Sequence, residues 1–221
     1  MIKQFSLAAV LFAAALAFFP AKVQAQEAVD LGLSVKWATC NLGATKPEQA
    51  GAYYAWGEIK PKAEYSWSNY KWCKGTEKTL TKYNYLEEFG SVDSVIKLEK
   101  QDDPAYVQTG GKWRMPTEVE FRELIRNCSW NTAAVNGVLC FKGVSRINGK
   151  VIYFPCAGVK EGSKLVCWND AGFYWTSTIN VYNEYEGATP HQAWHMYLCD
   201  EVAMLPFNRC LGISIRPVTD K

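Results

Sequence analysis

Apolar residues follow a clear helical period in one stretch of this chain. There they recur at i, i+3, i+4 and i+7, which is the spacing of a single buried helix face. These residues are Phe121, Leu124, Ile125 and Cys128. Thr117 stands before them and Glu120 follows it by three residues, so the two form a capping box. The pattern predicts a helix from about residue 117 to residue 127.

Downstream of this helix, short runs of apolar residues alternate with polar ones and are separated by Gly, Asn and Pro. Such period-two runs are typical of β-strands. The predicted strands cover residues 137–145, 150–158, 172–179, 193–200, 201–207 and 212–218. A further short strand is predicted at 34–39. The order of elements indicates an α+β fold in which the helix packs on an antiparallel sheet.

The first residues have the three parts of an export signal. A basic residue precedes the apolar run of residues 7–19, and a small-x-small cleavage site ends at Ala25. The run is short for a membrane span. Residues 1–25 are therefore interpreted as a cleaved signal peptide, and residues 26–221 as one mature domain. We expect a periplasmic, cell-surface or secreted protein with no membrane span in the mature chain.

Charge and cysteine content narrow the function classes. Of 24 basic and 22 acidic residues, the predicted signal peptide contains Lys3 and Lys22 and no acid, so the mature charges balance. Nucleic-acid binding would need a clustered basic excess, so nucleic acid is not expected as a partner. Eight cysteines occur without a Cys-x-x-Cys motif, which disfavours a zinc or redox site. Disulfides and buried free thiols remain equally open.

A polar, irregular segment at about residues 59–111 reads as a surface insertion in the domain. Aromatic residues recur within it at 64–75, and exposed aromatic rings can stack on sugars or anchor a partner. The ligand-binding candidates here are Tyr65, Trp67, Tyr70 and Trp72. Five other tryptophans are expected in the core: Trp37, Trp56, Trp113, Trp175 and Trp194.

The loop at residues 180–191 is a second candidate site. Its oxygen-bearing side chains could coordinate a hard cation such as calcium, and its tyrosines could stack on a ligand. The cation ligands would be Asn180, Asn183, Glu184 and Glu186, and the stacking residues would be Tyr182 and Tyr185. A solvated loop is the alternative interpretation. Apart from this calcium ion, we expect no cofactor.

Catalytic motifs are sparse, with no G-x-S-x-G elbow and no phosphate-binding loop. His191 and His195 have the spacing of a zinc-binding helix motif, but Gln192 replaces its Glu. On a strand the two histidines would lie roughly 13 Å apart, too far to share a metal. Asn169 and Asp170 follow a Trp as in a calcium-site motif, but a turn explains them better.

Six motifs, spread over about residues 29–218, form a set. They are VDLGLSVKWATCNLGA, YYAWGE, GGKWRMPTEVEFRELI, YFPCAG, GFYWTST and GISIRPV. The set resembles the major paralogous domain of Fibrobacter and Bacteroides surface proteins, and the formylglycine-generating-enzyme branch of the C-type-lectin-like fold. The resemblance implies a small twisted sheet with one or two flanking helices, long loops, and N- and C-terminal strands side by side. It also implies that Trp113 and Arg114 anchor the helix start in the sheet.

Formylglycine-generating enzymes use a closely spaced cysteine pair near the C-terminus. Cys199 and Cys210 are 11 residues apart and flank a predicted hairpin, where they would pair with each other or pack inside. The leading hypothesis is therefore an exported, non-catalytic protein that binds a glycan or surface polymer. A protein–protein module for adhesion or surface assembly is the alternative. An enzyme of the formylglycine-generating type is the third hypothesis.

Overall fold

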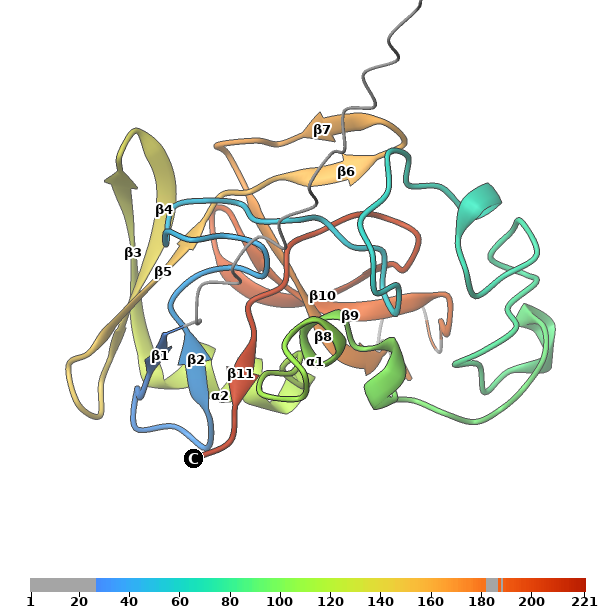
Figure 1. Cartoon of the computed structure of the whole chain (residues 1–221), viewed down its shortest axis with the longest axis horizontal. Helices are drawn as coiled ribbons and strands as arrows, with labels where there is room; N and C mark the ends of the chain where they lie inside the picture. Colours follow the sequence, from blue (N-terminus) through green and yellow to red (C-terminus); the bar gives the residue numbers. More distant parts are fainter. Residues whose placement is uncertain (1–26, 182–186, 188) are drawn as a thin grey trace, which may run out of the picture.

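Strands in small antiparallel sheets predominate over helices in this protein (Figure 1). This agrees with the predicted mixture of several strands and one main helix. The computed structural model describes residues 27–181, 187 and 189–221. The predicted signal peptide lies outside these residues. Within them, no helix has the length and apolar character needed to cross a membrane.

The two ends of the described chain meet in one three-stranded sheet. The central strand is β2 (Lys36–Ala38), between β1 (Ala28–Val29) and β11 (Val218–Thr219), and both pairings are antiparallel. Trp37 stands opposite Val218 and is fully buried. Figure 1 shows β2 and β11 side by side near the C-terminus. The predicted pairing of N- and C-terminal strands is confirmed.

Two other sheets have three antiparallel strands each, and a two-stranded hairpin completes the set. The first is a meander of β3 (Cys128–Val135), β4 (Val138–Ser145) and β5 (Val151–Pro155). The second is ordered β10 (Val202–Asn208), β9 (Gln192–Leu198) and β8 (Gly172–Ile179). The hairpin consists of β6 (Val159–Glu161) and β7 (Lys164–Val166).

The strand predictions differ from the structure in two places. Strands β1, β3, β6 and β7 were not predicted, because they are very short or lack a clear apolar alternation. Residues 212–218 form no continuous strand. Instead Gly212, Ile213 and Ser214 each bridge to a different neighbour, so this segment ties several elements together before it reaches β11.

Helix α2 (Glu118–Asn127) forms where the sequence predicts it. The Glu120 N–H donates to the Thr117 hydroxyl at 3.3 Å, and the Thr117 N–H donates to the Glu120 carboxylate at 2.7 Å. This reciprocal pair is the predicted capping box. Phe121 and Leu124 are fully buried on the inner face, while Ile125 is half-buried.

Arg114 ties the start of α2 to the terminal sheet. Its backbone exchanges hydrogen bonds of 3.0 and 2.9 Å with Val218. Its guanidinium donates to both carboxylate oxygens of Glu120, at 2.9 and 2.6 Å, and to Asp220 at 3.0 Å. Burial opposes the charge on Glu120, but the Arg114 bonds outweigh it and hold the Glu120 pKa below its usual value. The predicted anchoring role of Arg114 is confirmed.

Arg216 is a fully buried cation beneath the terminal strands. Its Nε donates to the Asn41 side chain at 2.9 Å, and its Nη1 donates to the carbonyls of Ala38 and Thr39 at 3.2 Å. The guanidinium lies 4.5 Å from the ring centroid of Phe154. Neutral acceptors and an aromatic face therefore take the place of a carboxylate partner. Burial lowers the pKa of Arg216 to about 10.

Four of the five predicted core tryptophans are buried, namely Trp37, Trp56, Trp113 and Trp175. The prediction is wrong for Trp194, which is half-buried. Its ring lies on the side of β9 that meets α2, with the Arg122 guanidinium 5.3 Å from the ring centroid. The Arg122 guanidinium of α2 therefore lies over the half-buried Trp194 ring.

The segment 59–111 contains short helices and no strand, and it extends to one end of the molecule (Figure 1). Its helices are η1 (Trp67–Asn69), η2 (Glu87–Phe89), η3 (Lys100–Asp102) and α1 (Pro104–Gln108). Asp102 holds the segment together, because it accepts hydrogen bonds from Lys82 at 2.6 Å, Lys71 at 3.3 Å and the Tyr83 hydroxyl at 2.7 Å.

Replacing Arg216 with lysine tests the buried guanidinium. Arg216→Lys keeps the charge but loses the planar fork that bonds Asn41 and covers Phe154, so it should lower the free energy of unfolding by about 2–4 kcal/mol. Urea denaturation measures the change. Arg126→Lys, on the exposed face of α2, is the matched control and should change stability by less than about 0.5 kcal/mol. Equal effects of the two substitutions would contradict this role of Arg216.

Candidate functional site

The aromatic residues at 64–75 serve the core of the insertion rather than its surface. Tyr65 and Tyr70 are 2% and 3% exposed, so the prediction that they are exposed is wrong. The Tyr65 hydroxyl donates to the Tyr53 carbonyl at 2.6 Å, and the Tyr70 hydroxyl donates to the Trp56 carbonyl at 2.8 Å. Tyrosine can be buried here because each hydroxyl finds an acceptor. Because the segment 59–111 contains no strand, buried aromatic rings such as Tyr65 and Tyr70 supply its apolar core.

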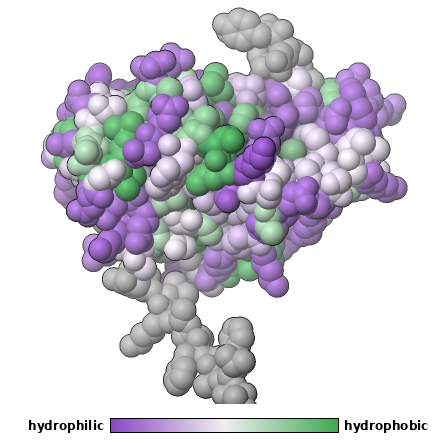
Figure 2. All heavy atoms as spheres, turned by 90° about the horizontal axis from the view of Figure 1, so that it is seen from above, coloured by the Kyte–Doolittle hydropathy of each residue, from purple (hydrophilic) through white to green (hydrophobic). Residues whose placement is uncertain are grey.

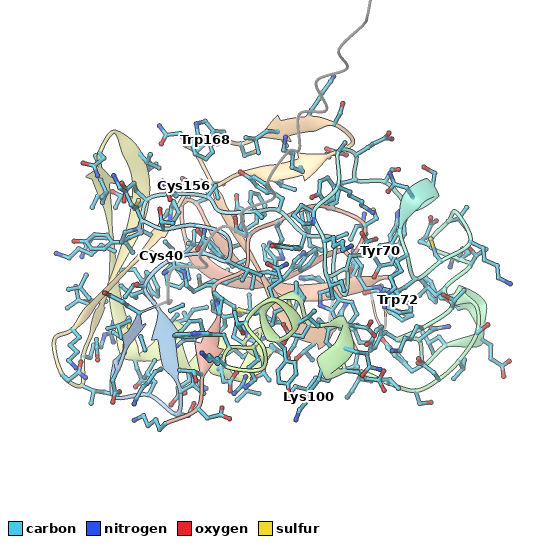
Figure 3. The ribbon with its side chains drawn as sticks, in the orientation of Figure 1. Cys40, Tyr70, Trp72, Lys100, Cys156 and Trp168 are labelled. Carbon is cyan, nitrogen blue, oxygen red and sulfur yellow. The ribbon has the colours of Figure 1, made fainter. Side chains whose placement is uncertain are left out.

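Trp72 is half-buried, and its stacking face is already covered. Its indole N–H donates to the Gly57 carbonyl at 2.9 Å. The ammonium groups of Lys71 and Lys82 lie 4.0 and 4.9 Å from its ring centroid. Trp67 is also half-buried, with its ring 5.5 Å from that of Tyr70 in an edge-on contact. Figure 3 shows Tyr70 and Trp72 among the crowded side chains of the insertion, which does not suit an open ligand platform.

Most of the predicted calcium and stacking residues of the loop at 180–191 lie outside the described residues. These are Tyr182, Asn183, Glu184, Tyr185 and Glu186. Asn180 is described and is fully buried, with its side-chain amide donating to the Thr189 hydroxyl. Across residues 27–181, 187 and 189–221, no three His, Cys, Asp or Glu side chains gather as a metal site. The calcium site stays a prediction.

Asn169 lies in a turn, as predicted. Its side-chain oxygen accepts the Leu139 N–H at 2.6 Å, and its own N–H donates to the Cys156 carbonyl at 2.9 Å.

His195 is a core residue of β9. Its ring stacks on Phe173 at 5.7 Å and lies 4.9 Å from the Phe207 ring, and its Nδ1 donates to the Leu205 carbonyl at 2.7 Å.

All eight cysteine positions are described, and no disulfide joins them. Cys73 and Cys210 pack in one apolar cluster. Cys40 is buried, with its sulfur 3.8 Å from the Thr39 hydroxyl. Cys199 and Cys210 flank β10, whose seven residues separate them by about 20 Å or more. Burial raises the pKa of Cys210 to about 12, so this thiol stays protonated at neutral pH.

A groove of about 530 Å³ lies between the insertion, the start of α2 and the C-terminal strand. We name it the Lys100 groove. Its lining comes from five segments: residues 97–100, Asp103 and Tyr106, residues 111–115, Ser177 of β8, and residues 218–220. Its volume falls within the range of about 300–1,000 Å³ that is typical of small-molecule sites. Figure 3 shows Lys100 at the edge of the molecule opposite Trp168.

Asp103 fixes the shape of the Lys100 groove. One carboxylate oxygen accepts the N–H groups of Ala105 and Tyr106 at 2.9 and 3.1 Å, which caps α1. The other accepts the Met115 N–H at 2.8 Å, which ties α1 to the segment before α2. Burial nevertheless raises the pKa of Asp103 above its usual value. Asp103 is occupied by backbone donors and serves as a structural residue.

Tyr106 supplies an aromatic wall of the groove. The ring is half-buried, and Gly111 lets the chain pass close to it. A Cβ at position 111 would lie 3.1 Å from the Tyr106 ring, and Gly111 also has a φ of +84°. The Lys100 ammonium lies 5.4 Å from the ring centroid. A flat apolar face and a cation therefore stand together at the groove wall.

Ser177 is a polar residue of the groove without a partner. It is 2% exposed, and its hydroxyl has no hydrogen-bond partner among the described residues. The backbone around it is well bonded, because its N–H donates to the Pro116 carbonyl at 2.7 Å and its carbonyl accepts the Leu98 N–H at 2.8 Å. A buried hydroxyl without a partner is unfavourable by about 1–3 kcal/mol. Ser177 therefore combines an unpartnered hydroxyl, among the described residues, with a place in the groove lining.

The sequence pattern did not indicate this groove. Residues 97–111 read as a loop that leads to the helix, and nothing in the order of residues places Ser177 or Asp220 beside them. Lys97, Lys100 and Lys112 precede the predicted helix and were the available sign of a cationic site. The outer two are 15 residues apart, so the three do not read as a cluster. Chemically, the groove combines cations, carboxylates, aromatic rings and hydroxyl groups, which is a set suited to binding.

No protein-family model, curated protein or solved structure matches this chain. The resemblance to the Fibrobacter and Bacteroides surface domain therefore stays a prediction, supported by the terminal strand pairing and the helix.

A pH titration tests the assignment of His195 as a neutral core residue. Burial lowers its pKa to about 3, whereas an unfolded histidine titrates near about 6.5. Its contribution to stability is complete above pH 6.5 and declines as the pH falls toward 3, because only the unfolded state takes up the proton. From pH 7 to pH 5, wild type should lose about 2 kcal/mol more than His195→Gln in the free energy of unfolding. Parallel profiles by urea denaturation would contradict the assignment.

Proposed function

We propose that this protein is an exported, non-catalytic binding protein of C-type-lectin-like fold that recognises a glycan or surface polymer in the Lys100 groove. The observation that carries the proposal is the buried Ser177, which lines a groove of small-molecule size and whose hydroxyl has no partner among the described residues. The Tyr106 face offers a surface on which a sugar ring can stack. The paired terminal strands and the capped helix support the fold assignment.

The groove has the form of a site on a rigid frame. Its walls are fixed by Asp103, by the Arg114–Val218 backbone pair and by the backbone bonds of Ser177. Binding residues on loops held by such a frame bind with little loss of conformational freedom. No nucleophile–base pair is needed for this function.

A protein partner is the second candidate, favoured by the exposed apolar side chains near β7. Leu165 is 38% exposed and Trp168 is 46% exposed. Figure 2 looks onto the side that carries β6 and β7, where hydrophobic patches are broken up by hydrophilic side chains. Large unbroken patches are the usual mark of a protein interface. The broken pattern on this side supports the glycan proposal over the protein partner.

Ser177→Ala tests the groove through binding and stability together. The variant should bind an array-identified glycan about five- to tenfold more weakly, because one hydrogen bond is lost. Without ligand it should be more stable by about 1 kcal/mol, since an unpartnered buried hydroxyl is removed. A glycan array on residues 26–221, with calcium and with chelator, supplies the ligand, and calorimetry and urea denaturation supply the two measurements.

Ser145→Ala is the matched control. Ser145 is buried like Ser177, but its hydroxyl donates to the Leu31 carbonyl at 2.7 Å and accepts the Ile147 N–H at 3.1 Å. This variant should lose stability and keep its affinity. Unchanged glycan affinity in Ser177→Ala would show that the ligand lies elsewhere. Binding to no glycan on the array would contradict the proposed function and favour a protein partner.

A further inference from the structure

We propose that the ligand of the Lys100 groove is an acidic glycan, in which a sugar carries a carboxylate or a sulfate group. This inference rests on the proposed function and specifies its ligand. It follows from the balance of charged groups in the groove, from the position of the Ser177 hydroxyl and from the Tyr106 wall.

The carboxylates that line the groove already have partners. Glu99 accepts hydrogen bonds from Lys82 and from Gln101, the latter at 2.8 Å. Asp220 accepts the Arg114 guanidinium at 3.0 Å. Asp103 is occupied by its three backbone N–H donors. Each carboxylate of the lining therefore already accepts hydrogen bonds within the protein, and Glu99 and Asp220 each accept from a cation.

The lysines of the groove are in the opposite situation. Lys97, Lys100 and Lys112 are exposed, and none forms an ion pair with a carboxylate in the described part of the chain. Three ammonium groups thus surround one groove, although the mature chain has balanced charges. This local excess attracts an anion.

The remaining groups of the groove suit a sugar that carries the charge. The buried Ser177 hydroxyl can donate to a carboxylate or sulfate oxygen, and a charge-assisted hydrogen bond of this kind is stronger than a neutral one. The half-buried Tyr106 ring lines the groove beside the Lys100 ammonium, so a sugar and its acidic group would meet an aromatic residue and a cation together. A nucleic acid would need a longer basic track for its phosphates than these three lysines provide.

Matched probes isolate the role of charge. A short oligogalacturonate and its methyl ester share one backbone and differ in the carboxylate, and dextran sulfate and dextran differ in the sulfate. Calorimetry with residues 26–221 should detect binding to one or both acidic probes and at least tenfold weaker binding to their neutral counterparts. The affinity should fall as sodium chloride rises from about 50 to about 300 mM, because exposed charges are screened. The two acidic probes distinguish a carboxylate ligand from a sulfate ligand.

A triple lysine variant locates the charge effect. Lys97→Gln, Lys100→Gln and Lys112→Gln together should weaken binding of the acidic probe by about tenfold or more. All three side chains are exposed, so an unchanged melting temperature is expected and is checked in parallel.

The matched control removes the same number of charges away from the groove. Lys46, Lys150 and Lys164 are exposed and form no ion pair among the described residues. Their triple replacement by glutamine should change the affinity by no more than about twofold. An equal loss in both triple variants would reveal non-specific attraction and overturn the inference.

The remaining outcomes separate this inference from the proposed function. Equal affinity for neutral and acidic counterparts, or array binding restricted to neutral glycans, would overturn the acidic ligand and leave glycan binding in place. Absence of binding to all four probes and to every array glycan would overturn both.

Discussion

The antiparallel contact between the two ends of the described chain is the constraint on which the rest of this structure depends. Val218 pairs with Trp37 of β2 and exchanges two backbone hydrogen bonds with Arg114. Arg114 in turn holds the capping residue of α2 and the C-terminal Asp220. Bringing Val218 back to Trp37 closes a loop that contains most of the chain, and this closure is entropically unfavourable. The hydrogen bonds among Val218, Arg114 and Asp220 offset part of that cost. The same contact forms one side of the Lys100 groove, and folding and binding therefore share it.

Aromatic residues in this protein form much of the core, and some of them also stabilise two buried arginines. Arg209 is fully buried, with its guanidinium 5.4 Å from the Trp56 ring and 5.6 Å from the Tyr70 ring. Arg216 lies against Phe154 in the same way. Such contacts replace the carboxylates that buried arginines usually require. Aromatic content in this chain is consequently a poor guide to ligand binding.

Local patterns in the sequence predict much of the fold. Thr117, Glu120 and the apolar spacing behind them fix α2, and the strand predicted at residues 172–179 matches β8 over its full length. The family resemblance supplied the terminal pairing, which no local pattern contains. Tyr65 and Tyr70 were placed wrongly, because polar neighbours in sequence do not reveal that a strand-free segment must bury its own rings. The groove was missed since Lys112, Ser177 and Asp220 are distant in sequence and meet only through the closed chain ends.

The most direct test of the Lys100 groove as the binding site is a nuclear magnetic resonance titration. Amide resonances of residues 26–221 would be followed as oligogalacturonate, or the tightest array glycan, is added. If the ligand binds in the Lys100 groove, the shifts should cluster at residues 97–115, at Ser177 and at residues 218–220, with those at 64–75 and 165–168 nearly unchanged. Shifts confined to 64–75 would return the site to the aromatic insertion, and shifts confined to 165–168 would place it on the hairpin face. Either result would contradict the account.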